Sequence, residues 1–320
     1  SAAAFKRPDQ LMENIIGITD YLGREIEEKG GDRSREALEV LRPKNGEPYY
    51  TDSQGGAWRL YPFVERTVCY QSAKSPELFA ASGRAFGRFQ KLLRDYPADT
   101  LHETIPHFHD TEDRLAKFKA AVEADKLGRA GECQKEIGFI LAREADCSVA
   151  LSAMREGRIP LRVTHNDTKL NNVLMDEVTG EGLCIIDLDT VMPGLAINDF
   201  GDSIRFGANH SAEDEQDLSK VNLDVGLFEA YTAAFLEGAG GSLTDEEIKL
   251  LPWGAKLMTL ECGMRFLTDY LVGDEYFHIS REGQNLDRAR TQFKLVADME
   301  DHWGELESIV AQHRPSPAAG

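Results

Sequence analysis

Three short apolar segments between Ile159 and Val191, each running into polar residues, constrain the fold of this chain more than any other feature. They read "IPLRVTHND", "NNVLMD" and "GLCIIDLDTV". Short runs rich in Val and Ile predict buried strands. The sequence on both sides has mostly helical spacing of apolar residues. A β insert with polar strand ends, placed inside a helical body, indicates an α+β protein.

The loop between the first two strands carries the residues most typical of catalysis. It reads His165-Asn166-Asp167-Thr168-Lys169-Leu170-Asn171-Asn172, an H-x-D-x-x-x-x-N pattern. Phosphoryl transfer needs a carboxylate for the attacking hydroxyl, oxygen ligands for Mg²⁺ and a cation near the moving phosphoryl group. We therefore expect Asp167 to be the base, Lys169 to contact the γ-phosphate, and Asn172 to hold Mg²⁺ through its amide oxygen. An ordinary polar loop of turn-forming residues is the alternative, and His165 is expected to brace the loop.

The third strand ends in a carboxylate that needs a partner. The run "CIIDLD" places Asp187 directly after apolar residues, 20 residues beyond Asp167. An unpaired charge at the end of a buried strand is costly, and a bound Mg²⁺ would offset that cost. We expect Asp187 to be the second metal ligand, with Asp189 as the lesser candidate. The letters Asp-Phe-Gly at Asp199 follow no apolar strand, so Asp199 is not expected to be the metal ligand.

Helical spacing of apolar residues predicts most of the remaining chain. A helix is expected in the residues after Pro8, ending at the Gly30-Gly31 pair, and strands are expected around a turn at 52–56. Further helices are expected at 81–93, 110–127, 216–237, 244–271 and 285–313.

The segment "HFHD", His107 to Asp110, resembles a metal-binding pair but lies directly before one of these helices. A capping loop with Asp110 or Thr111 as the N-cap is the preferred interpretation, and a role in a substrate loop is the alternative.

Composition excludes several classes of function. A net charge of −19 over 320 residues argues against a general nucleic-acid binder and against adhesion to anionic membranes. The five cysteines form no C-x-x-C pair, which indicates buried, reduced thiols in a cytoplasmic protein rather than a zinc or disulfide framework. No apolar run is long enough to predict a membrane span. Neither G-x-x-x-x-G-K-[ST] nor G-x-S-x-G occurs.

The strings "THNDTKLNNVLMD", "CIIDLDTVMPG" and "NDFGDSIRFG" resemble the aminoglycoside phosphotransferase and choline kinase superfamily. That resemblance implies a protein-kinase-like fold with two lobes. It also implies that Asp199 or Asp202 braces the active-site loops, by capping a helix or by bonding the catalytic-loop backbone. The strings "GGAWRLYPFVERTV", "IPHFHDTEDRLAKFKAAVEADKLGRA" and "LECGMRFLTDYLVGDEYF" are similar to bacterial N-acetylhexosamine 1-kinases, over nearly the whole chain from Phe5 to about Glu305. The resemblance implies transfer of phosphate from ATP, with Mg²⁺, to the anomeric hydroxyl of N-acetylglucosamine or N-acetylgalactosamine.

The resemblance also assigns roles to individual positions. It makes Asp167 the base for the sugar hydroxyl, and it implies the following contacts: Lys169 to phosphate, Asn172 and Asp187 to Mg²⁺, backbone groups near Val64 and Glu65 to adenine, and Arg265 and Tyr276, with Asp167, to the sugar.

Three regions are expected on this basis. Residues 1–68 would form a partial N-lobe with a helix, strands and the hinge, residues 69–313 a helical C-lobe with the catalytic and metal-binding loops, and residues 314–320 a disordered tail. The family's glycine-rich loop, and the strand with its phosphate-facing basic residue, would precede the first helix. They are absent from these 320 residues, and we expect that the sequence given lacks its true N-terminus.

Two other functions remain open at this point. A related kinase would use choline, homoserine or an aminoglycoside as acceptor, and an acidic or aromatic pocket would be needed for such a cation. A catalytically impaired pseudokinase would keep the fold without turnover. A monomer that binds ATP and a small sugar, without nucleic acid or membrane, is the default expectation.

Overall fold

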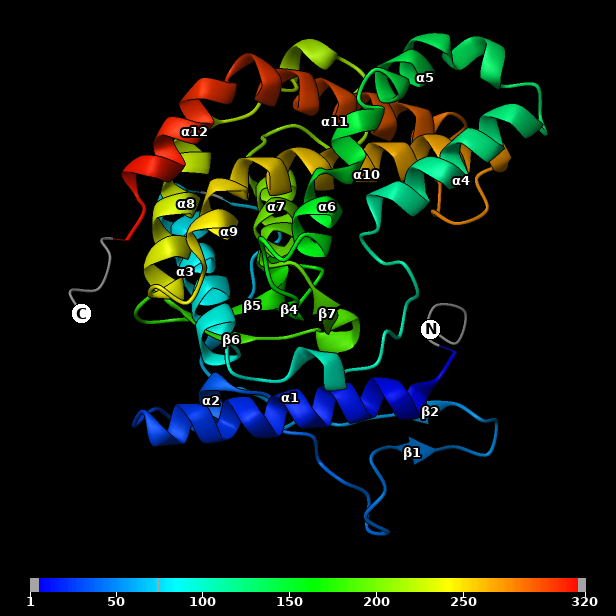
Figure 1. Ribbon diagram of the computed structural model, residues 1–320. Helices are drawn as coiled ribbons and strands as arrows, with labels where there is room; N and C mark the ends of the chain where they lie inside the picture. Colours follow the sequence, from blue (N-terminus) through cyan, green and yellow to red (C-terminus); the bar gives the residue numbers. More distant parts are fainter. Residues whose placement is uncertain (1–5, 74, 316–320) are drawn as a thin grey trace.

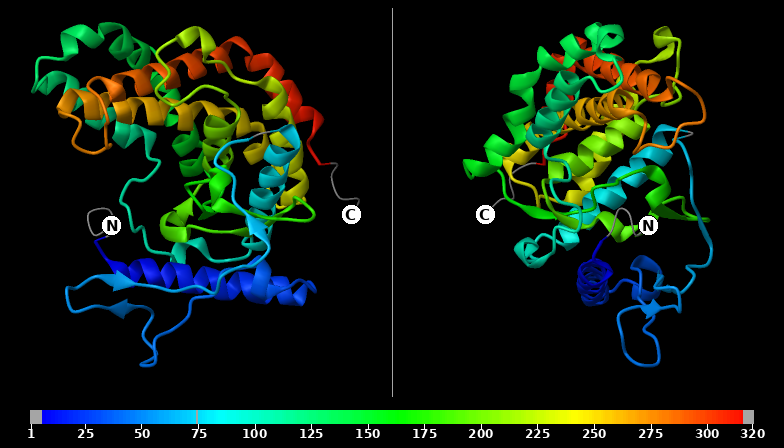
Figure 2. Two further views of the ribbon diagram at one scale, coloured as in Figure 1. Left: turned by 180° about the vertical axis from the view of Figure 1, so that it is seen from behind. Right: turned by 90° about the vertical axis from the view of Figure 1, so that its right-hand side faces the viewer.

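The computed structural model describes residues 6–73 and 75–315 and has the predicted α+β architecture, with helices predominating (Figure 1). One long helix and a small two-stranded hairpin lie on one side of the other two short sheets, and a larger helical body lies on the other (Figure 2). The predicted α+β class is therefore confirmed. Among the described residues, no helix is both long and apolar enough to cross a membrane.

The N-terminal region begins with helix α1 (Pro8–Glu28), followed by α2 (Arg33–Glu36) and a hairpin of β1 (Tyr50–Thr51) and β2 (Ala57–Trp58). Pro8 occupies the first turn of α1, where its missing N–H costs nothing. The predicted turn between the strands is present, because Asp52 Oδ1 accepts hydrogen bonds from the N–H groups of Gln54 and Gly56. Both predictions for this region are confirmed.

The α1 helix packs directly on the C-terminal region. Its buried face contributes to one hydrophobic cluster with residues of α3, of the third sheet strand and of the turn that follows it: Leu11, Ile15, Ile18, Leu22, Phe89, Cys184, Leu188 and Val191. This cluster crosses the expected boundary at residue 68. The two parts are therefore joined by a shared core as well as by the connecting chain.

The β insert consists of two small sheets that bring the polar strand ends together. One sheet has the order β3 (Thr67–Val68), β5 (Val173–Asp176), β6 (Gly182–Ile185), and the other pairs β4 (Arg162–Thr164) with β7 (Met192–Gly194). All of these pairs are antiparallel. Val173 lies opposite Ile185. The residues just before β5 and just after β6 therefore meet at the same end of the sheet. The third predicted strand is shorter than expected, since a 3₁₀ turn separates β6 from β7.

The helical body contains the remaining elements. They are α3 (Pro76–Leu92), α4 (Thr111–Ala124), α5 (Gln134–Leu141), α6 (Val149–Arg155), α7 (Ala196–Gly207), α8 (Val225–Ala239), α9 (Asp245–Lys249), α10 (Leu251–Val272), α11 (Gln284–Asp301) and α12 (Trp303–Gln312).

The helix predicted at 81–93 begins earlier in the structure, at Pro76, and three other predicted helices begin late or are interrupted. The helix predicted at 216–237 begins only at Val225, because Asp224 accepts a hydrogen bond from Leu227 N and forms the cap. The segment 244–271 breaks at Leu250, ahead of Pro252, whose ring cannot continue the preceding helix. The segment 285–313 breaks at His302. The tail predicted to be disordered lies outside the described residues from 316 onward.

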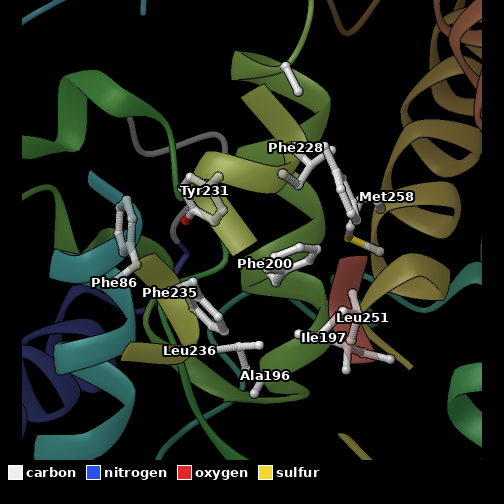
Figure 3. Packing of buried hydrophobic residues seen from close by; sticks show 14 of the residues in the cluster. Phe86, Ala196, Ile197, Phe200, Phe228, Tyr231, Phe235, Leu236, Leu251 and Met258 are labelled. Atoms are coloured by element: carbon white, nitrogen blue, oxygen red, sulfur yellow. The ribbon is translucent and has the colours of Figure 1, made fainter. Parts of the chain in front are cut away.

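The main core lies between α3, α7, α8 and α10, and Figure 3 shows its aromatic centre. Phe200 of α7 contacts the rings of Phe228 and Phe235 of α8, with centroids 5.8 and 5.4 Å apart. At Gly201, a Cβ atom would lie 2.1 Å from the carbonyl oxygen of Gly254, so glycine is required where α7 crosses α10. The second and third letters of the Asp-Phe-Gly triplet thus serve packing.

All five cysteines are free. Cys133, Cys147 and Cys184 are buried as expected, whereas Cys69 is exposed, so the prediction of buried thiols is wrong at that position. The reason is local: Cys69 follows β3 at the edge of a three-stranded sheet, outside the core clusters.

Candidate active site

The loop between β4 and β5 holds Asp167 among polar partners. Lys169 Nζ lies 2.7 Å from Asp167 Oδ1. Asn172 Nδ2 donates to the other carboxylate oxygen of Asp167 at 3.1 Å and to its carbonyl oxygen at 2.8 Å. Burial alone would lower the pKa of Lys169, but the facing carboxylate of Asp167 outweighs it and the pKa is raised. The structure thus brings Asp167, Lys169 and Asn172 together with a charged ammonium beside the carboxylate.

Asp187 lies at the end of β6, next to this loop. Ile186 N donates to the carbonyl oxygen of Asn172 at 2.9 Å, which fixes the two segments side by side. The Asp187 backbone has φ 58°, a left-handed conformation that is uncommon outside glycine. Partial burial and the carboxylates of Asp189 and Asp167 raise the pKa of Asp187. Asp187 therefore faces other acidic residues, and negative charge is concentrated at this end of the sheet.

The arrangement suits a divalent cation held by few protein atoms. The amide nitrogen of Asn172 is used by Asp167, which leaves its side-chain oxygen for a cation. Mg²⁺ in phosphoryl-transfer sites takes one or two protein oxygens and completes its shell with phosphate and water. Over residues 6–73 and 75–315, no group of three or more His, Cys, Asp and Glu side chains has the geometry of a metal site. Asn172 and Asp187 together fit a Mg²⁺ ion that is held by two protein oxygens and completed by phosphate and water.

Asp189 has a different partner. Its carboxylate forms an ion pair with Arg59, which follows β2, and the Arg59 guanidinium also lies 5.5 Å from the centre of the Tyr61 ring. Burial, together with the charges of Asp189 and Asp187, raises the pKa of Tyr61 to about 12 although Arg59 opposes the shift. Since its charge is already balanced, Asp189 is less suited than Asp187 to hold a cation.

Two aspartates in the first turns of α7 hold the backbone of the catalytic loop. Asp199 accepts hydrogen bonds from the backbone N–H groups of His165 and Asn166, at 2.9 and 2.8 Å, and from Gln90 at 2.8 Å. Asp202 accepts one from Thr168 N at 2.9 Å. The predicted support of the loop backbone is confirmed. Neither residue is a helix cap, because α7 begins after Leu195.

His165 has the bracing role expected of it. Its Nε2 lies 2.9 Å from the carbonyl oxygen of Ile186, and its ring packs edge-on against Phe86 and Phe89. The histidine therefore ties the catalytic loop to the end of β6 and sits on the core, away from a catalytic position.

The proposed hinge residues precede β3. Val64 is buried and Glu65 is exposed. Their carbonyl oxygens already accept hydrogen bonds, from Thr67 Oγ1 at 2.9 Å and from Arg35 Nη2 at 3.3 Å respectively. The backbone N–H groups of this segment are therefore the better candidates for contact with adenine.

Arg265 and Tyr276 share one cavity of about 290 Å³, as the resemblance implies. The Arg265 guanidinium lies over the rings of Phe108, Tyr276 and Phe277, at 6.0, 5.6 and 5.3 Å from their centres. Asp167 is not part of that cavity wall. A second cavity, of about 580 Å³, is lined by Lys169, Arg205, Phe206, His210 and Gln71.

One residue with a direct link to the catalytic loop was not singled out by sequence. His109 Nε2 lies 3.1 Å from the carbonyl oxygen of Asn166, and its Nδ1 lies 3.1 Å from Glu261 Oε1. The adjacent Asp110 caps α4 as predicted. The "HFHD" segment stood out as a whole in the sequence, but the partners of His109 could not be identified from it because they are distant in sequence.

Solved structures of kinases are similar to the chain at low sequence identity. An ethanolamine kinase from Plasmodium vivax is 14% identical over 86% of this chain and 72% of its own, with a TM-score of 0.49. A choline/ethanolamine kinase family protein from Mesorhizobium loti is 16% identical over 92% and 84%, also at 0.49. A putative aminoglycoside phosphotransferase from Ralstonia eutropha is 13% identical over 92% and 83%, at 0.48.

A sequence profile carries the assignment. The profile described as the phosphotransferase enzyme family matches residues 32–238, well over half of the chain. The match includes the hinge segment, the catalytic loop, Asp187 and α7. The chain therefore belongs to the phosphotransferase enzyme family.

Proposed function

We propose that the chain is an ATP- and Mg²⁺-dependent kinase that phosphorylates the anomeric hydroxyl of N-acetylhexosamines, N-acetylglucosamine or N-acetylgalactosamine, to give the sugar 1-phosphate. The observation that carries the proposal is that Asp167, Lys169, Asn172 and Asp187 lie together at one end of the sheet. The chain that brings them together belongs to a phosphotransferase family. The acceptor comes from the similarity of the segments around Arg265 and Tyr276 to sugar 1-kinases.

In this proposal Asp167 binds the sugar hydroxyl and takes its proton as the new O–P bond forms to the γ-phosphorus of ATP, while the bond from that phosphorus to the bridging oxygen breaks and ADP leaves. Asn172 holds one oxygen of Asp167 and Lys169 the other, so the carboxylate is oriented before the acceptor arrives. The ammonium of Lys169 also lines the larger cavity, where it would stabilise charge on the phosphoryl oxygens. Mg²⁺, when held by Asn172 and Asp187, would neutralise the phosphate chain.

The cavity around Arg265 favours a neutral acceptor over a cationic one. Its walls are aromatic, which suits the C–H face of a sugar, and Arg265 donates hydrogen bonds without accepting any. The one carboxylate in the wall, Asp269, already accepts hydrogen bonds from the N–H groups of Tyr276 and Phe277 at 2.8 and 2.9 Å. A cationic choline or aminoglycoside would therefore meet the Arg265 guanidinium in the cavity wall, and such a like charge disfavours binding.

An assay of ADP release tests the proposal against its alternatives. The full chain is given ATP and Mg²⁺ with N-acetylglucosamine, N-acetylgalactosamine, choline, homoserine or an aminoglycoside. We expect turnover with at least one hexosamine and none with its 1-deoxy analogue, which lacks the anomeric hydroxyl. Turnover with choline or an aminoglycoside alone would move the chain to another branch of the family. Lack of turnover with every acceptor would support the pseudokinase alternative.

A further inference from the structure

His109 lies where three segments meet. Its side chain is only 10% exposed, and that of Glu261, its partner on α10, is 2% exposed. The other ring nitrogen faces the carbonyl oxygen of Asn166, the residue before the proposed base. The contact joins the loop that precedes α4, the middle of α10 and the catalytic loop.

Both neighbours of the His109 ring are hydrogen-bond acceptors. A backbone carbonyl can only accept, and an ionised carboxylate can only accept. Neutral imidazole carries a single N–H, so it would leave one of these buried oxygens facing a bare nitrogen. The two contacts of 3.1 Å are both satisfied when each ring nitrogen carries a proton. The geometry thus selects the imidazolium form.

The surrounding charges favour the same form. Burial alone would raise the pKa of Glu261, but His109, Arg265 and Arg114 outweigh it and lower the pKa. Burial would likewise lower the pKa of His109, yet the carboxylate of Glu261, with a further contribution from Asp202 of α7, raises it above the ordinary value of 6.5. The charged groups that face the pair thus keep Glu261 ionised and His109 protonated.

The contact links the acceptor cavity to the catalytic loop. Phe108, next to His109, lines the Arg265 cavity, and the two rings lie 4.4 Å apart. Glu261 lies one helical turn before Arg265 on α10. Asn166 has φ 65°, a left-handed conformation that asparagine adopts more readily than most residues, and its carbonyl group leads directly into Asp167.

We propose that His109, as a buried imidazolium, is a positioning residue that holds the carbonyl group of Asn166 and thereby sets Asp167 relative to the Arg265–Tyr276 cavity. This inference rests on the proposed function, because it treats that cavity as the acceptor site. It predicts that loss of the protonated ring lowers kcat through misplacement of Asp167, while the KM for ATP is little changed.

The "HFHD" segment offers a matched pair of substitutions. His107 and His109 both have φ 57°, and asparagine tolerates that conformation better than most residues, so His107→Asn and His109→Asn place similar demands on the backbone. His107 is 59% exposed and lies 3.2 Å from Asp110. We expect His109→Asn to lower kcat about 10- to 100-fold, since small misplacement of a reacting group has costs of that order, and His107→Asn to change it less than about threefold.

The pH profile separates positioning from simple structural support. In the native chain kcat is expected to stay on its plateau above pH 6.5 and to fall only as the raised pKa of His109 is passed. Glu261→Gln removes the facing charge and should move that fall to lower pH. In His109→Asn the fall attributable to this group should disappear. If both variants lower only the melting temperature, with kcat per folded molecule and its pH profile unchanged, positioning by His109 is excluded.

Nitrogen NMR of the histidine rings provides a readout that needs no acceptor. The His109 signal is identified by its loss in His109→Asn, and at pH 7 we expect both ring nitrogens to carry protons when exposed histidines are largely neutral. One bare His109 nitrogen at pH 7 would overturn the inference. Failure of hexosamine turnover with an imidazolium signal intact would instead refute only the proposed acceptor.

Discussion

Asp187 and Asp199 lie twelve residues apart, close to the same catalytic loop, yet their surroundings are opposite. Asp199 is 1% exposed, and three N–H donors occupy its two oxygens. Asp187 is exposed at a sheet edge, in a left-handed conformation, beside the carboxylates of Asp189 and Asp167. A carboxylate whose oxygens are filled by the protein supports structure, whereas one that faces other carboxylates is available to a cation.

The two aspartates show that a sequence motif does not by itself identify the metal ligand. The triplet at Asp199 matches the protein-kinase signature in spelling, but its three residues brace a loop, fill a core and allow a close helix crossing. The residues "IID" that end at Asp187 do not match the Asp-Phe-Gly triplet. They lie at the end of β6, where we propose that the cation binds. Four substitutions test this difference, beginning with the largest expected effect.

Asp187→Asn should lower kcat about a thousandfold, with little change in melting temperature. A metal ion contributes several kcal/mol to such a transfer, and each step of about 1.4 kcal/mol is a tenfold change in rate. Steady-state kinetics with saturating ATP and acceptor, together with thermal unfolding of the same preparation, provide the measurement. A kcat within tenfold of the native value would show that Asp187 does not hold the metal.

Asp202→Asn should lower the free energy of unfolding by about 3 kcal/mol at pH 7, because it removes the buried carboxylate that pairs with the Arg205 guanidinium at 2.9 Å and leaves that guanidinium with the more exposed Glu213 at 3.5 Å. Burial alone would raise the pKa of Asp202, but Arg205, His109 and Lys169 outweigh it and lower the pKa below its usual 3.8. The stabilisation is therefore present above pH 3.8 and lost as the pH falls below it. Urea unfolding from pH 7 to pH 3 should show the native and variant free energies converging, and a constant difference would contradict this assignment.

Asp199→Asn should lower the free energy of unfolding by about 2 kcal/mol, since an amide NH₂ would replace one oxygen that now accepts N–H donors. We expect kcat of the folded fraction to fall far less than in Asp187→Asn. Chemical denaturation and kinetics on one sample measure both quantities. Catalytic loss equal to that of Asp187→Asn, with unchanged stability, would reverse the roles of the two aspartates.

Asp189→Asn should have the smallest effect, with kcat reduced less than about tenfold. The substitution removes the ion pair with Arg59 but leaves Asn172 and Asp187 in place. It also removes one of the carboxylates that raise the pKa of Asp187, so the pKa of Asp187 should fall. A loss as large as that of Asp187→Asn would make Asp189 a metal ligand as well.

The parts of the site that lie close together in sequence could be predicted. Asp167, Lys169 and Asn172 share one loop, and a hairpin of the predicted length brings Asp187 beside them, because Val173 pairs with Ile185. The bracing of the loop by Asp199 or Asp202 was implied by the family resemblance, and the hydrogen bonds of both residues confirm it.

Features that depend on distant contacts could not be predicted. His109 binds Asn166 and Glu261, which are 57 and 152 residues away, and no local pattern encodes such a meeting. The breaks at Leu250 and His302 were missed because apolar periodicity continues through both positions, so it does not register a one-residue interruption. The exposure of Cys69 depends on sheet-edge position, which spacing alone does not determine.

Binding of Mn²⁺, as a probe for Mg²⁺, is measured by calorimetry in the presence of ADP to decide which aspartate holds the metal. The full chain is compared with Asp187→Asn and Asp199→Asn at a temperature where all three remain folded. We expect that Asp187 holds the metal, so Asp187→Asn should weaken metal affinity at least tenfold, whereas Asp199→Asn should bind Mn²⁺ as the native chain does. Native affinity in Asp187→Asn, with loss of affinity in Asp199→Asn, would contradict this assignment.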